Sequence, residues 1–428
     1  MKTKTTIMKT VYSFIALVLI LNSPVFSQWN IAYTPSTAQT VMTMKFWDAN
    51  TGYHAGVLYS ASTMNIHKTT NGGLNYVQQS SGWTAQRFMT TWLLSPDTVL
   101  MAGNYGKIIK TVNGGSNWTT VYADTTLQFW GLWFTTPQTG IIAGSGGTIM
   151  RTTNRGDNWV IVTSPTITAL DGIWFVNDNT GYIGGANVFL KTTNGGTNWV
   201  NKSGLFISGF ETATSIYFSD ANTGVYGTNA SRIVRTTDGG ETYTEVFNSS
   251  NNAIWGLSFV NANTGYGCTS SGKVVKTTNG GVNWGFQNTP LTENLYEIHF
   301  PAENTGYVAS WSGKILKTTN GGLTYTGQIS TTVPKNYELR QNFPNPFNPS
   351  TIISFQLPRN GNVSIKIYDV NGREVQTLVN ESMNAGSYEV SFDATGLSSG
   401  VYYYRLEVRN SSSTSNVFSD TKRMMYLR

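Results

Sequence analysis

The sequence predicts an all-β protein, a seven-bladed β-propeller followed by a small C-terminal β-sandwich. Three observations carry this prediction. A nine-residue motif recurs seven times at steps of 40 to 44 residues, and a fixed period of that size indicates repeated supersecondary units. No segment shows the sustained 3.6-residue periodicity of an amphipathic helix. Past residue 330 the repeat stops, and several short alternating segments follow. The motif copies begin at Lys68, Lys110, Arg151, Lys191, Arg235, Lys276 and Lys317.

Residues 1–27 are predicted to be a secretory signal peptide. A lysine-containing start precedes an apolar run, Val11–Leu21, and Val25, Phe26 and Ser27 then offer small or modest residues around a cleavage site. The alternative is a membrane anchor. The apolar run is shorter than the roughly 20 residues that a spanning helix needs, so we expect cleavage and no integral membrane segment afterwards.

Charge and cysteine content narrow the possible partners. The formal net charge of +6 falls to +3 when residues 1–27 are removed, because they hold three lysines and no acidic residue. Seven of the remaining cations occupy the repeat motif instead of clustering, which argues against a nucleic-acid-binding surface. Cys268 is the single cysteine, so no intrachain disulfide can form, and we expect it in the core. No spacing of His, Cys or acidic residues indicates a metal site, and we expect no cofactor.

Each repeat unit is predicted to contain four strands. A marker such as Phe175–Tyr182 ends the first strand, turns at Asn-Thr-Gly and begins the second. The third strand runs into the nine-residue motif, whose Asn-Gly-Gly makes a hairpin, and the fourth strand starts at the aromatic residue of the motif. The second unit is degenerate, with Leu93 and Val99 in place of Phe and Gly. Four strands in about 41 residues is the size of a propeller blade, so residues 28–330 are predicted to form seven blades.

The motif resembles the Asp-box (BNR repeat) of sialidases and of exported propellers of the photosystem II assembly-factor type. Thr192, Asn194, Gly196 and Trp199 fit its pattern of a hydroxyl residue, Asp or Asn, Gly and an aromatic residue. In those families the short polar side chain bonds backbone amides of a hairpin turn, on the face away from the active site. The alternative is a metal or sugar ligand at each box. The resemblance implies a structural role for Asn71, Asn113, Asn154, Asn194, Asp238, Asn279 and Asn320.

Residues 28–34 are predicted to close the ring non-covalently. The segment around Trp29 resembles fourth strands such as Asn158–Val162, although all seven motifs already have a fourth strand of their own. We therefore expect residues 28–34 to join the sheet of the last blade. They either displace Tyr325–Ile329 from that sheet or extend it.

Residues 338–428 are predicted to form the antiparallel sandwich, after a linker at 331–337. Alternating segments and an Asn-Gly hairpin at 371–372 indicate its strands, and a Pro-rich opening is predicted to be an extended lead-in. The expected strands are Ile352–Leu357, Val363–Val370, Ser387–Phe392 and Val401–Val408.

This C-terminal segment closely resembles the type A C-terminal sorting domain of the type IX secretion system. The matching segments are 341–351, 357–358, 367–375, 397–406 and 421–424. The resemblance implies that the type IX machinery reads the domain at the outer membrane. The domain is then commonly removed, and the protein is released or attached to the cell surface. The alternative is an ordinary accessory sandwich.

The loops opposite the boxes are the predicted place for a ligand. Aromatic side chains near a channel mouth can stack on sugars or pack against a protein partner, and the alternative is packing between blades. Tyr59, Tyr105 and Trp311 lie in one set of these loops. Counting back four residues from each marker Phe, or from Leu93, gives the other set: Met42, Met89, Trp130, Asp171, Thr214, Trp255 and Tyr296. The candidate ligand-binding residues are Trp130, Asp171, Trp255, Tyr296 and Trp311.

No catalytic residue is predicted. Sialidases bind a substrate carboxylate with three arginines. Here only Arg87 and Arg232 remain in the propeller once the arginines of the motifs are excluded, so such a triad cannot be assembled. Another glycosidase would need two carboxylates about 5–10 Å apart. The acidic residues expected on the loop face are Asp124, Asp171, Glu211, Glu293 and Glu297.

Together these features predict a secreted or cell-surface binding propeller whose ligand is a protein or a glycan. The alternatives are a polysaccharide-acting hydrolase or lyase and a structural surface scaffold. The expected partner besides the ligand is the type IX secretion machinery. The expected location is extracellular or on the outer-membrane surface, after removal of the signal peptide and the C-terminal domain.

Overall fold

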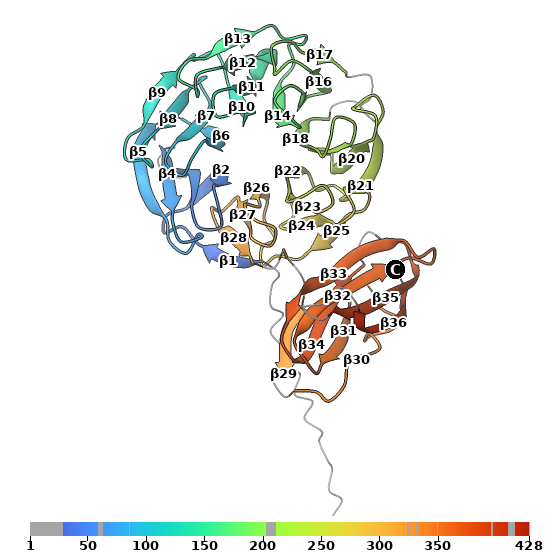
Figure 1. Ribbon diagram of the computed structural model, residues 1–428. Helices are drawn as coiled ribbons and strands as arrows, with labels where there is room; N and C mark the ends of the chain where they lie inside the picture. The colour runs from blue at the N-terminus through green and yellow to red at the C-terminus, as the bar shows by residue number, and fades with distance from the viewer. Residues whose placement is uncertain are drawn as a thin grey trace, which may run out of the picture.

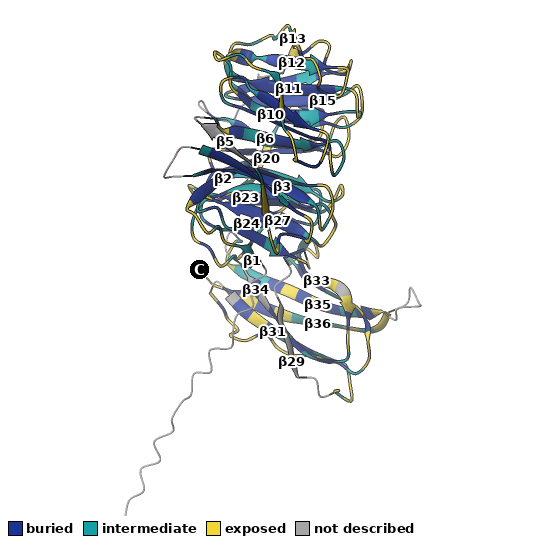
Figure 2. Cartoon of the chain, turned by 90° about the vertical axis from the view of Figure 1, so that its left-hand side faces the viewer, coloured by how far each residue is buried: buried dark blue, intermediate teal, exposed yellow. Residues whose placement is uncertain are grey.

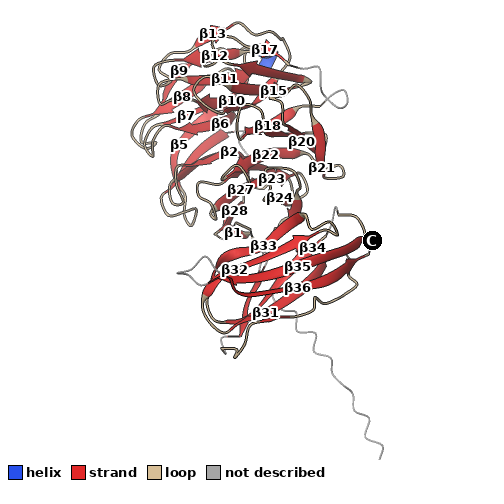
Figure 3. Ribbon diagram, turned by 45° about the vertical axis from the view of Figure 1, so that its right-hand side comes forward, coloured by secondary structure: helices blue, strands red, loops and turns tan. Residues whose placement is uncertain are grey.

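The computed structural model describes residues 29–427 apart from 59–62, 85, 203–210, 320, 323–324, 331–332, 349, 395–396 and 410–415. The predicted signal peptide, Tyr59 and Asn320 therefore lie outside the described residues. Within the described ranges, the only helical element is η1 (Ser145–Gly147), a single 3₁₀ turn, and the regular structure is otherwise β (Figure 3). The all-β prediction is confirmed.

Seven four-stranded antiparallel sheets form a ring around a central channel (Figure 1). The first six blades each take four consecutive strands, with the first strand innermost. These are β2 (Gln39–Phe46), β3 (Gly52–Leu58), β4 (Thr63–Thr69) and β5 (Val77–Thr84); β6 (Phe88–Leu93), β7 (Val99–Gly103), β8 (Ile108–Thr111) and β9 (Thr119–Tyr122); β10 (Phe129–Phe134), β11 (Gly140–Gly144), β12 (Ile149–Thr152) and β13 (Val160–Val162); β14 (Leu170–Phe175), β15 (Gly181–Gly185), β16 (Val188–Thr192) and β17 (Val200–Asn201); β18 (Ala213–Phe218), β19 (Gly224–Thr228), β20 (Arg232–Thr236) and β21 (Thr244–Asn248); and β22 (Ile254–Phe259), β23 (Gly265–Thr269), β24 (Val274–Thr277) and β25 (Gly285–Gln287).

The core of the propeller lies between neighbouring blades. Ile108 of the second blade and Ile142 and Met150 of the third share one buried cluster, for example. The second strand of every blade is almost entirely buried and the first strand mixes buried with half-buried residues, while exposed residues gather in the loops (Figure 2). Each sheet thus buries its faces against its two neighbours, which is what a ring of sheets requires.

The seventh blade is assembled from both ends of the propeller. It contains β26 (Leu295–His299), β27 (Gly306–Ser310) and β28 (Ile315–Thr318), and its fourth strand is β1 (Asn30–Tyr33). β1 pairs antiparallel with β28, with Asn30 opposite Lys317. The prediction that residues 28–34 close the ring is confirmed for the described part of that segment.

Trp29, just before β1, takes the place of the aromatic residue of the last motif. Its indole is fully buried and lies edge-on to Phe300, with ring centroids 5.7 Å apart at 89°. In the fourth blade Trp199 lies against Phe175 in the same way, at 5.9 Å and 85°. Of the two closures considered from the sequence, displacement is the one observed, because β29 (Tyr325–Ser330) pairs with β34 (Gly386–Asp393) instead.

The C-terminal module is a sandwich of two four-stranded sheets. One has the order β29-β34-β31-β30, with β31 (Ser350–Leu357) and β30 (Glu338–Leu339). The other has the order β33-β32-β35-β36, and its strands are β33 (Glu374–Met383), β32 (Gly361–Tyr368), β35 (Gly400–Arg409) and β36 (Asn416–Tyr426). A single buried cluster spans both sheets. Four of these strands match the expected ones, and β30, β33 and β36 were not foreseen. A strand at Tyr325–Ile329 was expected in the last blade, but β29 lies in the sandwich instead.

The basic residue at the head of each motif links neighbouring blades. Lys276 Nζ donates to the carbonyl oxygen of Gly321 in the next blade at 3.0 Å. Across the closure, Lys317 Nζ donates to the Gly72 carbonyl oxygen at 2.9 Å. The repeated cations are therefore used inside the ring, which explains why they are spread around it.

Candidate functional site

The seven residues found by counting back four from each marker line one cavity at one end of the channel. Its volume is about 410 Å³, and Thr212, Asn229 and Glu297 complete its lining. We call this set of seven the mouth ring. Its members are Met42, Met89, Trp130, Asp171, Thr214, Trp255 and Tyr296. Four of the five candidate ligand-binding residues therefore meet in one place.

A β-bulge places every member of the mouth ring. In the third blade Phe129 pairs with Gly144 and Gly131 pairs with Ala143, so that Trp130 between them has no partner in the ladder. The same one-residue shift occurs at the corresponding position of the other six first strands. A bulge frees one residue from pairing and re-aims its side chain, and bulges are over-represented next to active sites.

The fifth candidate, Trp311, lies at the edge of the cavity. Its side chain is 48% exposed, and its ring centroid is 5.7 Å from that of Tyr296. Tyr296 is in turn 5.8 Å from Trp255. The three side chains form a row of aromatic rings that begins in the cavity and ends at the surface.

Two of the five acidic residues expected on this face line the cavity. Burial raises the pKa of Asp171 to about 6, and Asp171 has neither a hydrogen bond nor an ion pair with any described residue. Burial also raises the pKa of Glu297 to about 7, against the attraction of Lys45. Both carboxylates are thus held where the charged form is poorly solvated.

The other three acidic residues are used by their own loops. Asp124 accepts hydrogen bonds from the backbone and the hydroxyl of Thr126. Glu211 forms an ion pair with Arg232 at 3.0 Å, and Glu293 accepts a hydrogen bond from a serine hydroxyl. No arginine is among the described residues that line the cavity.

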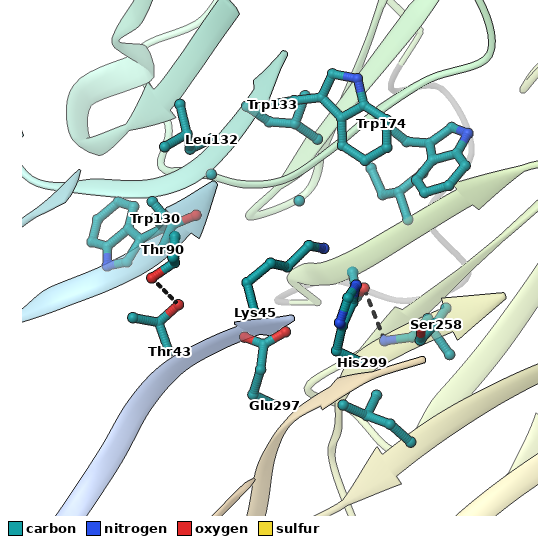
Figure 4. Close-up of a pocket in the computed structure, with 18 of the residues that line it drawn as sticks. Thr43, Lys45, Thr90, Trp130, Leu132, Trp133, Trp174, Ser258, Glu297 and His299 are labelled. Carbon is teal, nitrogen blue, oxygen red and sulfur yellow. Dashed lines mark hydrogen bonds between the residues drawn. The ribbon is translucent and has the colours of Figure 1, made fainter. Parts of the chain in front are cut away.

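Deeper in the channel lies a second cavity of about 380 Å³, which shares five lining residues with the first. Figure 4 shows Lys45, Glu297 and His299 pointing into it, with Trp133 and Trp174 on the opposite wall. The centroids of these two indoles are 4.5 Å apart. This cavity therefore combines four titratable side chains, those of Lys45, Asp171, Glu297 and His299, with an aromatic wall.

Glu297 and Asp171 were among the acidic residues expected from the sequence, whereas Lys45 and His299 were not among the sequence candidates. Lys45, Trp133, Trp174 and His299 each lie one residue before a marker Phe, so the repeat itself held the signal. His299 Nδ1 accepts a hydrogen bond from the Phe46 backbone amide at 3.2 Å, and burial lowers its pKa well below the usual value. His299 is therefore neutral at neutral pH.

The boxes lie beside the Asn-Thr-Gly turns, at the far end of the first strands from the mouth ring. Thr192 Oγ1 and the Asn198 backbone amide both donate to Asn194 Oδ1, at 3.0 and 2.9 Å. The Gly196 amide donates to Thr192 Oγ1 at 3.1 Å, and the Trp199 indole donates to the Gly196 carbonyl oxygen at 3.2 Å. The side-chain oxygen makes the same pair of bonds at Asn71, Asn113, Asn154, Asp238 and Asn279.

Neither a metal-binding cluster nor a membrane-spanning helix is found in the part of the chain that the structure describes. No group of three or more His, Cys, Asp or Glu side chains is close enough to hold a metal ion. No described helix is long and apolar enough to cross a membrane.

Comparison with known families identifies the C-terminal module. Residues 341–419 match the family model of the secretion system C-terminal sorting domain. The C-terminal module is a type IX secretion sorting domain. The sorting domain directs export to the cell surface or the extracellular space, and the secretion machinery is its partner.

Solved structures similar to this chain share its propeller. YCF48 from Cyanidioschyzon merolae matches with a TM-score of 0.54 at 19% identity, and a structure described as YCF48 bound to D1 peptide matches with 0.56 at 17%. U3-55K matches with 0.56 at 7%. The matches cover 68%, 69% and 68% of this chain and 98% of each of the others. At these identities the likeness is one of fold alone. No curated protein sequence matches the chain.

Proposed function

We propose that the chain is a type IX-exported binding propeller that recognises a protein or a glycan at the mouth ring and the adjoining Trp311. The observation that carries the proposal is the convergence of seven bulged residues, one from each blade, on a single cavity. These seven positions hold five different residue types, whereas the boxes are nearly identical. A binding site needs such differences, and a repeated hairpin does not.

The cavity suits a ligand in size and chemistry. Its volume of about 410 Å³ falls in the range of about 300–1,000 Å³ for ligand sites. The row formed by Trp255, Tyr296 and Trp311 offers flat apolar faces of the kind that stack on sugar rings or pack on side chains. One structurally similar propeller is described as bound to a peptide, so peptides belong among the ligands to test here.

Glycan and peptide arrays probed with the chain from residue 28 to 428 test this proposal. We expect a bound class whose signal falls at least about tenfold in Trp255→Ala and in Trp311→Ala, because truncating a buried or stacking aromatic anchor costs more than about 1.4 kcal/mol. Trp47→Ala is the matched control, because Trp47 is 47% exposed and directly follows the marker Phe46, at the far end of the first strand from the mouth ring. Equal losses in Trp311→Ala and Trp47→Ala would contradict a site at the mouth.

A second candidate function is hydrolysis or lysis of a polysaccharide. It is favoured by Asp171 and Glu297, which line the same cavity with pKa values raised to about 6 and about 7. Carboxyl groups with raised pKa values can serve as general acids near neutral pH. A hydrolysis screen tests this candidate: sugar release that is lost in both Asp171→Asn and Glu297→Gln supports catalysis. Silence in this screen and in the arrays supports a surface scaffold.

We also propose the remaining assignments. Residues 1–27 form a cleaved signal peptide, residues 28–330 the propeller and residues 338–428 the sorting domain, joined by the linker 331–337, although β29 at the end of the propeller range pairs in the sheet of the sandwich. The boxes are Asp-boxes with a structural role, which the hydrogen bonds of Asn194 support. Cleavage within the linker would separate β29 from its partner strand β34, so the molecular mass of the released propeller locates the boundary directly.

A further inference from the structure

The channel mouth holds negative charge without a matching cation. Its cavity is lined by Asp171 and Glu297, and no Lys or Arg is among the described residues that line it. Lys45 lies in the deeper cavity, where its attraction partly opposes the rise that burial causes in the pKa of Glu297. His299 is neutral, as its lowered pKa requires. Lys45 therefore offsets one carboxylate, and Asp171 has no counter-ion among the described residues.

An unpaired carboxylate in a cavity selects among ligands. A neutral ligand that fills the cavity strips water from Asp171, so the carboxylate must either stay charged and unpaired or take up a proton, and both oppose binding at neutral pH. A cationic ligand group replaces that water with an ion pair and a charge-assisted hydrogen bond. The raised pKa of Asp171 reports the same unmet need for a positive neighbour.

The walls of the cavity favour a cation with an apolar stem. Trp130, Trp255 and Tyr296 contribute aromatic rings, whose faces attract ammonium and guanidinium groups. Met42 and Met89 contribute flexible apolar side chains that adapt to an alkyl chain. Glu297 lies one residue beyond the mouth-ring position of the seventh blade and adds a second carboxyl group to the lining of the same cavity.

We propose that the mouth ring is a receptor for a lysine or arginine side chain presented by a partner protein, with the cation paired to Asp171 and the stem packed against Trp130 and Trp255. This inference rests on the proposed binding function and specifies its ligand. A lysine or arginine side chain combines a terminal cation with three or four methylene groups. An amino sugar carries its cation directly on a hydroxylated ring and offers no such stem to the methionines.

Three blocked tripeptides test the inference: acetyl-Gly-Lys-Gly-amide, acetyl-Gly-Arg-Gly-amide and acetyl-Gly-Gln-Gly-amide. They are titrated into the chain from residue 28 to 428, with calorimetry and tryptophan fluorescence as readouts. We expect the Lys or the Arg peptide to bind with a dissociation constant of about 1 mM, and the Gln peptide to bind at least about tenfold more weakly. Affinity should fall as the pH drops from 7 to 5, because Glu297 becomes protonated around pH 7 and Asp171 around pH 6, and Asp171→Asn separates the two contributions.

Variants assign the effect to the mouth ring. Asp171→Asn should weaken the Lys and Arg peptides at least about tenfold. Asp171→Thr, which copies Thr214 of the fifth blade, should do the same and provides a second variant if the first fails to fold. Trp47→Ala should bind as the unchanged chain does.

Each other outcome overturns the inference. It fails if no cationic peptide binds up to about 10 mM, if the Gln peptide binds as tightly, or if Asp171→Asn binds unchanged. Preference for an oligomer of glucosamine over the peptides, lost in Asp171→Asn, would make the ligand an amino sugar. A neutral oligosaccharide whose binding depends on Trp255 but not on Asp171 would keep the proposed function and reject its cationic ligand.

Discussion

The fourth and seventh blades reach the same geometry by different routes. In the fourth blade the box and its tryptophan are continuous in the chain, and Trp199 lies edge-on to Phe175 at 5.9 Å. In the seventh blade the box begins at Thr318, while its tryptophan is Trp29, from the other end of the propeller. A blade is thus defined by its contacts and not by chain continuity. The split blade joins the two ends of the ring without a covalent bond.

The two blades differ in how they use the indole N–H. In the fourth blade Trp199 donates to the carbonyl oxygen of Gly196, within its own box. In the seventh blade Trp29 donates to Gln287 Oε1 at 3.2 Å, and Gln287 Nε2 donates to the Gly322 carbonyl oxygen at 2.6 Å. Gln287 belongs to the sixth blade, so the split box is tied to its neighbour by a glutamine that the continuous box does not need.

The interface between the third and fourth blades also differs from the interface between the seventh and first blades, which β1 closes. Ile183 and Leu190 are paired on adjacent strands of the fourth blade and face the blade before it. The corresponding pair in the first blade is His54 and His67, stacked at 4.7 Å. Their neighbour across the closing seam is Tyr33 of β1, 5.8 Å from His54. Both ring nitrogens of His54 are buried without a described partner, so this seam carries a desolvation cost that the aliphatic pairs avoid.

The largest expected effect is that of Trp29→Ala measured against Trp199→Ala. Each change removes a buried indole and should cost about 3–5 kcal/mol of unfolding free energy. The loss should be greater for Trp29, because β1 then remains attached to β28 by only a short ladder and the ring can open at the seventh blade. Urea unfolding and limited proteolysis of both variants measure the difference. Identical losses would mean that the split blade is no weaker than the continuous one.

The second prediction concerns pH and the closing seam. Burial lowers the pKa of His67 to about 4 and that of His54 well below the usual value, so both are neutral in the folded protein. When folding lowers the pKa of a histidine, its contribution to the free energy of unfolding is fully present above the unfolded-state pKa of about 6.5. That contribution is lost as the pH falls below this value. For His67 alone the loss between pH 6.5 and 4 is on the order of 3 kcal/mol.

A variant that copies the fourth blade tests this assignment. His54→Ile with His67→Leu should raise stability at pH 7 and flatten its decline between pH 6.5 and 4 in urea unfolding. The unfolding free energy of the variant should still decline somewhat with falling pH, because burial lowers the pKa of His299 as well. Tyr33 and Tyr76 face the pair and titrate only at high pH, so they do not contribute in this range. An unchanged slope would assign the acid sensitivity elsewhere.

The periodic part of the fold could be predicted because each blade repeats the same local chemistry. The positions of the mouth ring could be predicted by counting four residues back from each marker Phe or from Leu93. The sequence did not reveal the β-bulges that turn these side chains toward the cavity. The closing role of Trp29 was also foreseeable. Whether β1 or residues 325–330 would occupy the edge of the seventh blade was not, because the outcome depends on β34, a partner outside the repeat.

The missed features lack a periodic signal. Pairing shifts register at two places between β32 and β33, which breaks the alternation by which a strand is recognised. Most of β36 is exposed or half-buried, with only Met424 and Tyr426 buried, so it has no apolar face to reveal it. Lys45 and His299 occupy one repeat position, but a single sequence does not show that this position faces the channel.

The third prediction extends the comparison to the mouth ring, where the fourth blade has Asp171 and the seventh has Tyr296. Burial raises the folded-state pKa of Asp171 to about 6, so its charge opposes folding above that pH and not below the unfolded value of about 3.8. Asp171→Asn should therefore raise the unfolding free energy at pH 7 by up to about 3 kcal/mol. It should change nothing at pH 3.5. Destabilisation at pH 7 would mean that Asp171 has a structural partner after all.

The smallest expected effect compares the boxes themselves through Thr192→Ala and Thr318→Ala. Each threonine hydroxyl accepts a hydrogen bond from a buried glycine amide, at 3.1 Å from Gly196 and at 2.8 Å from Gly322. Removing the hydroxyl should cost about 1 kcal/mol in either blade, because the amide loses its acceptor. If the split box works as the continuous one does, the two losses should agree within about 0.5 kcal/mol. A much larger loss for Thr318→Ala would show that the hydroxyl also holds β1 in place.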